Sequence, residues 1–313
     1  MLLSLVTDSL GFLPFPQMLD KAAALGFKGL ELGCGNWSRA PHLDLDGLLG
    51  STGKRKDFLE AIAARGLAIA ALNCSGNQLA PKPEGAAHEA VVEKTFRLAG
   101  LLGVGKVVMM SGLPGGGPGD KEPNWITTSW PPRNAEVLSW QGEAVALPWW
   151  RKAVVAAKAA GIGRIALENH GCQLVYSPST LMRLRDAVGD TIGMNLDPSH
   201  LFWMGGDPLA AARFLGPAIY HVHAKDVRLE GGPVGIDGVL DTKGIEAWAS
   251  RAWNYVALGH GHGLRWWKEF IAVLRMAGYD GAVSLEMEDQ SMDACAGIER
   301  SLEVLRAAWP SSL

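Results

Sequence analysis

The chain has 313 residues, 48 % of them hydrophobic and 19 % charged, which is the composition of a globular protein with a large buried core. Its formal net charge of −3 argues against partners that bind a basic surface, such as nucleic acids and anionic membranes. The apolar start, residues 1–8, lacks the basic flank of a signal peptide, and no segment approaches the length of a membrane span. No paired spacing, as in a disulfide framework or a zinc site, occurs among Cys34, Cys74, Cys172 and Cys295. We therefore expect a cytoplasmic protein whose partner is a small molecule.

The predicted secondary structure alternates regularly between strands and helices. An opening strand at residues 2–8 is followed by seven junctions, at each of which an Ala- and Leu-rich helical stretch ends at a glycine and a β-type run begins. Glycine suits the position just past a helix end because it lacks a Cβ and adopts the left-handed conformation freely. In chain order the junctions are Gly26 before GLELG, Gly66 before LAIAALN, Gly103 before KVVMMSG, Gly161 before RIALENH, Gly189 before IGMNLDP, Gly216 before IYHVHAKD and Gly278 before AVSLEMED.

These patterns predict eight strands, each followed by a helix. Strands that alternate with helices pair in parallel, because each crossover returns the chain to the same end of the sheet. We therefore predict a single-domain α/β protein over residues 1–313, a (β/α)8 TIM barrel. A doubly wound open sheet is the alternative, but no glycine-rich dinucleotide fingerprint follows the first strand.

Two longer segments interrupt the compact repeat, at about residues 113–141 and 228–262. The first is rich in Gly, Pro and Trp, and both follow predicted strands, so in a barrel both are rim loops on the face where active sites are built. We expect them to cover a pocket, with a solvated insertion or an oligomer contact as the alternative. The sequence does not determine the oligomeric state, and the tryptophans on these rim loops are compatible with a homo-oligomer, either a homodimer or a tetramer.

Ionisable residues end four consecutive predicted strands, in the runs ALENH, MNLDPSH, HVHAKD and SLEMED. Side chains alternate between the two faces of a strand, so in each run the polar residues share one face and the apolar residues between them point to the helix layer. The polar sets are Glu168 with His170, Asn195 with Asp197, His221 with His223 and Lys225, and Ser284 with Glu286 and Glu288.

Polar groups inside a barrel are costly unless they are paired. Any one of these residues is compatible with an ordinary ion pair at a strand end. Four adjacent strands with matching parity are better explained by a metal ion that binds three carboxylates and one imidazole. Such an oxygen-rich set favours a single Mn²⁺ or Mg²⁺ and is compatible with Co²⁺ or Zn²⁺.

The segments LENHG, NLDPSHLFW, HVHAKD and GYDGAVSLEMED, in this order, resemble the xylose isomerase-like TIM barrels known as sugar phosphate isomerases/epimerases. The resemblance spans essentially the whole barrel and is strongest between Glu168 and Glu286. Its Asp-x-x-His pattern places His200 beside a mononuclear site. The metal ligands that the resemblance implies are Glu168, Asp197, His223 and Glu286.

The resemblance implies a sugar isomerase or epimerase acting on a ketose, keto-sugar or polyol. In that chemistry a proton next to a carbonyl is removed, the metal stabilises the resulting enediolate, and Glu168 and Glu286 serve as the catalytic base and acid. The expected substrate-binding residues are His170, His200, His221, Lys225, Asn73, Trp37, His260 and His262.

Two departures from the family pattern leave the substrate open. The run Gly259-His260-Gly261-His262 stands where many relatives have Gly-Glu-Gly, and the motif that begins at Asn73 lacks an expected histidine. Neither a glycine-rich phosphate loop nor an arginine cluster is evident in the sequence, which favours an unphosphorylated substrate.

Three alternative functions follow from the same residues. A lyase or dehydratase, similar to inosose dehydratase or acting on a 3-keto glycoside, shares the first step of the isomerase reaction, so the metal ligands do not separate the two. An endonuclease IV-like activity is more remote, because the additional metal ligands of that enzyme are missing around Trp253-Asn254-Tyr255 and the chain is slightly acidic. A non-catalytic sugar sensor is disfavoured by the intact ligand set.

Overall fold

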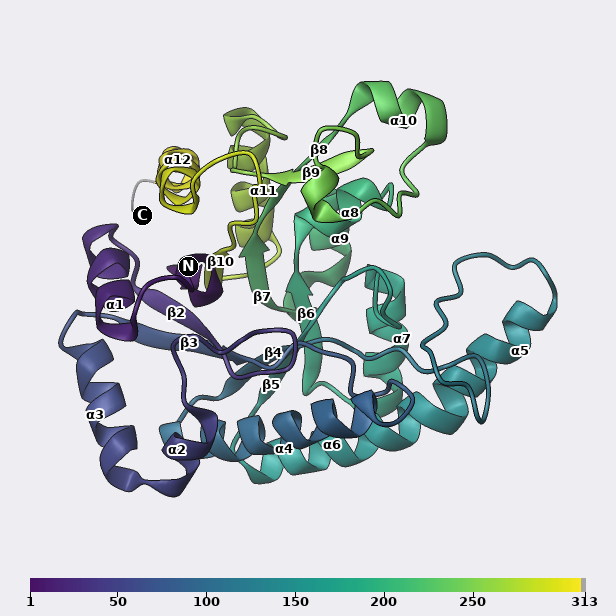
Figure 1. The fold of residues 1–313 in the computed structure, drawn as a ribbon, viewed down its shortest axis with the longest axis horizontal. Helices are drawn as coiled ribbons and strands as arrows, with labels where there is room; N and C mark the ends of the chain where they lie inside the picture. Colours follow the sequence, from purple (N-terminus) through teal and green to yellow (C-terminus); the bar gives the residue numbers. More distant parts are fainter. Residues whose placement is uncertain (311–313) are drawn as a thin grey trace.

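Eight parallel strands close into a barrel in the computed structural model, which describes residues 1–310. Residues 311–313 of the predicted domain lie outside the described part. The last barrel strand pairs with the first, from Leu2 beside Ala282 to Leu5 beside Leu285, so the ring has no open edge. The predicted (β/α)8 barrel is confirmed (Figure 1). In ring order the strands are β1 (Leu2–Val6), β2 (Gly29–Gly33), β3 (Ala68–Asn73), β4 (Lys106–Met109), β5 (Arg164–Glu168), β6 (Ile192–Leu196), β7 (Ile219–Ala224) and β10 (Ala282–Leu285).

Helices cover the outside of the ring and lead from one strand to the next (Figure 1). All seven glycines predicted to end the helical stretches have positive φ, between 51° and 103°. None of the helices within residues 1–310 combines the length and the apolarity that crossing a membrane requires. The α-helices are α1 (Phe15–Ala24), α2 (Leu45–Gly50), α3 (Thr52–Ala63), α4 (Glu84–Leu102), α5 (Arg133–Ser139), α6 (Leu147–Ala159), α7 (Pro178–Val188), α8 (Pro198–Trp203), α9 (Pro208–Leu215), α10 (Gly231–Asp237), α11 (Leu264–Met276) and α12 (Ala294–Ala308).

The main apolar core lies between the strands and the surrounding helices. The residues predicted to point to the helix layer belong to it, and Trp267 of α11 is fully buried there. The inside of the barrel holds a separate apolar cluster. A register shift between β6 and β7 leaves Tyr220 without a pairing partner in β6. Its ring packs in a small separate cluster with Ala71, Val108 and Ala166. The residues that follow toward the carboxyl ends of the strands are polar.

The segment predicted as a rim loop at 228–262 is not an irregular loop. Its residues contribute to an antiparallel hairpin of β8 (Asp226–Leu229) and β9 (Trp253–Val256), with α10 between the two strands. The hairpin and α10 project beyond one end of the barrel (Figure 1). The other predicted loop, 113–141, ends in α5 and a π-helical turn, Trp140–Ala146.

Candidate metal centre

The four predicted metal ligands converge at the carboxyl ends of β5, β6, β7 and β10. One ligand atom from each of them lies within 4.8 Å of the others. Glu168 is the last residue of β5 and His223 lies in β7, whereas Asp197 and Glu286 directly follow their strands. The polar residues that the sequence placed on one face of each strand therefore form a single cluster in the mouth of the barrel.

The cluster leaves three buried atoms without a hydrogen-bond partner among residues 1–310, namely Asp197 Oδ2, His223 Nδ1 and Glu286 Oε2. His223 Nδ1 lies 3.0 Å from Glu286 Oε2 and 3.5 Å from Glu168 Oε2, so these atoms are close without forming a well-directed hydrogen bond. The other oxygen of Asp197 accepts from the Ser199 amide at 2.7 Å. Buried polar atoms rarely stay unpaired, and a divalent cation satisfies oxygen and imidazole lone pairs together. The residues fit a divalent metal.

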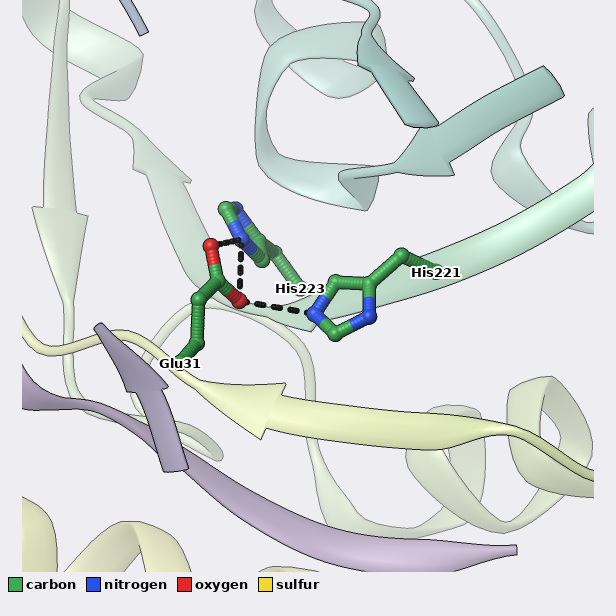
Figure 2. A group of neighbouring side chains, drawn as sticks. All are labelled: Glu31, His221 and His223. Atoms are coloured by element: carbon green, nitrogen blue, oxygen red, sulfur yellow. Dashed lines mark hydrogen bonds and ion pairs between the residues drawn. The ribbon is translucent and has the colours of Figure 1, made fainter. Parts of the chain in front are cut away.

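Glu31, which the sequence reading did not single out, orients the imidazole ligand. Figure 2 shows its carboxylate between His221 and His223, with His223 Nε2 at 3.0 and 3.1 Å from its two oxygens. A hydrogen bond donated from Nε2 leaves the lone pair on Nδ1, the nitrogen that faces Glu168 and Glu286. Glu31 therefore selects the tautomer of His223 that can bind a metal.

The surroundings of Glu31 keep it ionised. It is fully buried, which by itself would raise its pKa, but His223 and His221 beside it hold that pKa well below its ordinary value. Its oxygens also accept from His221 Nε2 at 2.7 Å and from Asn73 Nδ2 at 2.7 Å. Glu31, His221 and His223 are close enough to hold an ion of their own, but as arranged they form a hydrogen-bond network.

His200 lies beside the ligands, as the Asp-x-x-His pattern implies. Its Nε2 is 3.0 Å from Glu168 Oε1 and 3.4 Å from Asp197 Oδ2. On its other side Nδ1 faces the hydroxyl of Tyr255 at 3.3 Å. Burial holds the pKa of His200 well below its ordinary value, so the imidazole is neutral at pH 7. The ring of His170 stands 4.1 Å from the His200 ring.

Lys225 supplies the positive charge of the site. Its Nζ lies 2.5 Å from Glu288 Oε2, 3.4 Å from Glu286 Oε1 and 4.2 Å from the centre of the Tyr255 ring. Burial would lower the pKa of Lys225, but Glu286 and Glu288 raise it well above its ordinary value. Burial would likewise raise the pKa of Glu286, yet Lys225 and His223 hold it below its ordinary range.

The surroundings of the two candidate catalytic residues, Glu168 and Glu286, affect their pKa values differently. Burial raises the pKa of Glu168, with the neighbouring Glu286 adding to the effect and His223 opposing it. Burial also raises the pKa of Asp197 to about 8. The pKa values of the two glutamates are therefore shifted in opposite directions, upward for Glu168 and downward for Glu286.

The remaining predicted substrate-binding residues are spread around the site. His221 is fully buried below the ligands against Glu31 and Ser284, and Asn73 is turned to Glu31. His262 stacks on Phe202 and its Nδ1 lies 2.8 Å from Asp226 Oδ1, whereas His260 is exposed. Trp37 is 49 % exposed and its ring lies 6.1 Å from that of His170. Of this group, Trp37 borders the site through His170. Asn73 and His221 contact Glu31, and His262 contacts Asp226, so none of these three makes a polar contact with the four candidate ligands within residues 1–310.

The departure at Gly259-His260-Gly261-His262 has its own structural role. The carboxylate of Asp226 accepts from the amides of Gly259, Gly261 and His262 at 2.9 to 3.2 Å. A Cβ on Gly261 would lie 2.2 Å from the carbonyl oxygen of Val227, so only glycine fits there. Asp226 thus fixes this turn to the start of the β8–β9 hairpin.

A family model described as a xylose isomerase-like TIM barrel matches residues 19–308 of the chain. The chain belongs to the xylose isomerase-like TIM barrel family. This confirms the resemblance carried by the strand-end motifs. Among curated proteins, the chain is 58 % identical over 308 residues to the uncharacterized protein YfiH of Bacillus subtilis (strain 168), covering 98 % of each chain.

Solved structures with the same fold include two enzymes of different reaction type. The probable 3-DHS dehydratase AsbF involved in petrobactin synthesis, from Bacillus anthracis, is 18 % identical with a TM-score of 0.67, covering 98 % of this chain and 99 % of that one. The D-psicose 3-epimerase of Clostridium cellulolyticum H10, solved with D-tagatose, is 15 % identical with a TM-score of 0.61, covering 97 % and 99 %. At these identities the likeness concerns the fold alone.

Proposed function

We propose that the protein is a divalent-metal-dependent isomerase or epimerase acting on a ketose, keto-sugar or polyol. The convergence of Glu168 and Glu286 on one metal-binding point carries the proposal. Their Oε2 atoms lie 3.5 and 3.0 Å from the same nitrogen, Nδ1 of His223, yet they arrive from strands on different sides of it. Two carboxylates placed in this way reach opposite faces of a substrate carbon, as proton exchange at that carbon requires.

The metal ligands would be Glu168, Asp197, His223 and Glu286, and a bound divalent ion, with Mn²⁺ or Mg²⁺ favoured, supplies Lewis-acid stabilisation of negative charge on substrate oxygens. One of the two glutamates removes the proton next to the carbonyl, and the other returns a proton to the opposite face. Lys225 donates hydrogen bonds toward Glu286 and the substrate oxygens near it. His200, neutral and in contact with both Glu168 and Tyr255, positions the Glu168 carboxylate.

The exposed indole ring of Trp37, beside the site, is an argument for a carbohydrate substrate. Trp37 presents a half-exposed indole next to His170, and the C–H faces of sugars stack on such surfaces. The D-tagatose in the epimerase structure of the same fold agrees with this substrate class.

A lyase is the second candidate, because the fold is shared with AsbF, described as a probable dehydratase. Elimination begins with the same proton removal and then needs an acid for the leaving group. Lys225 and Tyr255, which are in contact with each other, are donors available for that step. Product analysis separates the two reactions, since an epimerase gives an isomer and a lyase releases a fragment or water.

The test is incorporation of solvent deuterium into ketoses and 3-keto glycosides by the metal-loaded protein. Glu168→Gln and Glu286→Gln should each lower exchange by about 100-fold or more, because each removes a proton carrier. Glu303→Gln, on the exposed side of α12, is the matched control and should leave exchange unchanged. Exchange that survives in both active-site variants, with normal folding by circular dichroism, would show that the acid/base assignment is wrong.

A further inference from the structure

The hydrogen position on the imidazole of His200, beside the metal centre, follows from the groups around it. Its Nε2 lies 3.0 Å from Glu168 Oε1 and 3.4 Å from Asp197 Oδ2. Its Nδ1 lies 3.3 Å from each of two groups, the indole Nε1 of Trp203 and the hydroxyl of Tyr255. A neutral imidazole carries one hydrogen, on Nδ1 or on Nε2, and its other nitrogen is an acceptor. The partners of the two nitrogens therefore decide which tautomer His200 adopts.

Trp203 is the partner that distinguishes the two tautomers, because an indole N–H donates and cannot accept. The hydroxyl of Tyr255 can do either, so it fits both. Donation from Trp203 Nε1 requires a lone pair on His200 Nδ1, which places the hydrogen on Nε2. In the other tautomer two N–H groups would face each other at 3.3 Å, and the lone pair of Nε2 would face the carboxylate of Glu168. Both ends of the ring thus agree on a hydrogen at Nε2.

Packing holds the indole of Trp203 where it reaches His200. Both residues lie on α8, three positions apart, and therefore on the same side of the helix. Trp203 is 9 % exposed, and its ring stacks on that of Trp253 in β9, with centroids 4.9 Å apart and planes 7° apart. The edge of the Trp203 ring fills the space beside Gly171, where an added Cβ would lie 2.6 Å from Cη2. A ring packed at its face and at its edge has little freedom to turn away from Nδ1.

The hydrogen on Nε2 of His200 controls which oxygen of Glu168 faces the point where the candidate metal ligands converge. Oε1 is the oxygen that accepts it, at 3.0 Å. Oε2 is then left facing Nδ1 of His223, at 3.5 Å. In this tautomer Nε2 has no lone pair for a metal, so Glu168, His170 and His200 do not form a second metal site, although their ligand atoms lie within 4.8 Å of one another.

We propose that Trp203 is a positioning residue, whose indole N–H fixes the tautomer of His200 and thereby orients the carboxylate of Glu168 at the metal centre. The hydrogen bonds run in one direction, from Trp203 to His200 and from His200 to Glu168. The tautomer follows from these contacts alone. The effect on catalysis rests on the proposed function, in which Glu168 carries a proton.

The tautomer is tested by nitrogen NMR on the chain labelled at its histidine nitrogens, with Mg²⁺ present. The signals of His200 are identified as those missing from His200→Gln. Nitrogen shifts distinguish a ring nitrogen that carries a hydrogen from one that does not, and we expect the hydrogen on Nε2. A hydrogen on Nδ1 of the wild-type protein would show that the proposal is wrong. This measurement needs no change at Trp203, so it does not depend on how well a variant at that position folds.

Trp203→Phe removes the donor and keeps an aromatic ring in the stack, and Trp253→Phe is the matched control. The control makes the same change in the other ring of the stack, whose Nε1 donates to the Val239 carbonyl at 3.1 Å instead. The Nδ1 signal of His200 should move in Trp203→Phe and stay in place in Trp253→Phe. A folded Trp203→Phe with an unmoved Nδ1 signal, or a larger movement in Tyr255→Phe, would overturn the assignment to Trp203.

The kinetics of solvent-deuterium incorporation test the effect on catalysis. Loss of a buried hydrogen bond that orients Glu168 should lower kcat by about tenfold and leave KM within about twofold of wild type. Trp253→Phe should lower kcat by less than about threefold. Equal losses of kcat in the two variants would contradict the positioning role of Trp203. Absence of exchange in wild type would instead contradict the proposed function, and the NMR result on the tautomer would stand apart from it.

Discussion

Replacing Glu31 by glutamine should weaken divalent-metal binding without removing a metal ligand. The carboxylate accepts from His223, His221 and Asn73 at 2.7 to 3.1 Å. A glutamine offers one acceptor oxygen, and its amide group would face imidazole N–H donors. The proton of His223 then has no fixed acceptor at Nε2 and can move to Nδ1, the atom that faces the other ligands. Changes of this kind cost about 10- to 100-fold in metal affinity, or about 1.4 to 2.7 kcal/mol.

The assay is competition of the metal-stripped chain with a chelator of known affinity, using Mn²⁺ and then Zn²⁺. Glu303→Gln makes the same chemical change on the exposed face of α12 and should keep the wild-type affinity. Thermal unfolding of both metal-free variants shows whether the fold is intact. A dissociation constant for folded Glu31→Gln within about twofold of wild type would refute the idea that Glu31 sets the tautomer of His223.

Two predictions concern stability rather than metal binding. Burial lowers the pKa of Lys106 to about 8 from 10.5, so the folded state is penalised fully below pH 8 and the penalty disappears as pH rises toward 10.5. Lys106→Met should therefore be more stable than wild type at pH 7 by up to roughly 3 kcal/mol. Urea unfolding should show this gap narrowing as pH rises from 8 toward 10.5, and a pH-independent gap would contradict the prediction. Gly193→Ala would place a Cβ 2.3 Å from the Tyr220 ring and should cost about 1–3 kcal/mol, whereas Gly163→Ala, with open space around it, should change unfolding by less than about 0.5 kcal/mol. Equal effects of the two alanines would show that the Tyr220 contact relaxes freely.

Much of the barrel was predictable because its signals are local. Each helix-ending glycine is recognisable within a few residues, and strand parity follows from the alternation of side chains. The clustering of Glu168, Asp197, His223 and Glu286 was predictable for the same reason, since each lies at or just after the end of a strand of a repeating unit. Their convergence required only that the strands be parallel and close into a ring.

Glu31 escaped prediction because its partners are distant in the sequence. The run GLELG contains one glutamate between two leucines and no neighbouring polar pattern, while His221 and His223 follow about 190 residues later. The signal available was parity, because a charged residue inside a buried strand must face the barrel interior. The β8–β9 hairpin was missed for a similar reason, since its short strands are separated by residues 230–252 and no tight turn joins them. Strands paired across so many residues produce no pattern that a short stretch of sequence would show.

The place of Glu31 in the ring ties metal capture to completion of the fold. β2, which carries Glu31, is separated from β7, which carries His223, by β1 and β10, the first and last strands of the barrel. The contact between the two residues therefore spans the seam where the chain ends meet. A chain in which the second half has folded but the seam is open would hold the four candidate ligands and lack the carboxylate that orients one of them. We therefore expect tight metal binding only after the ring has closed, so that a metal-binding signal during refolding would report this closure.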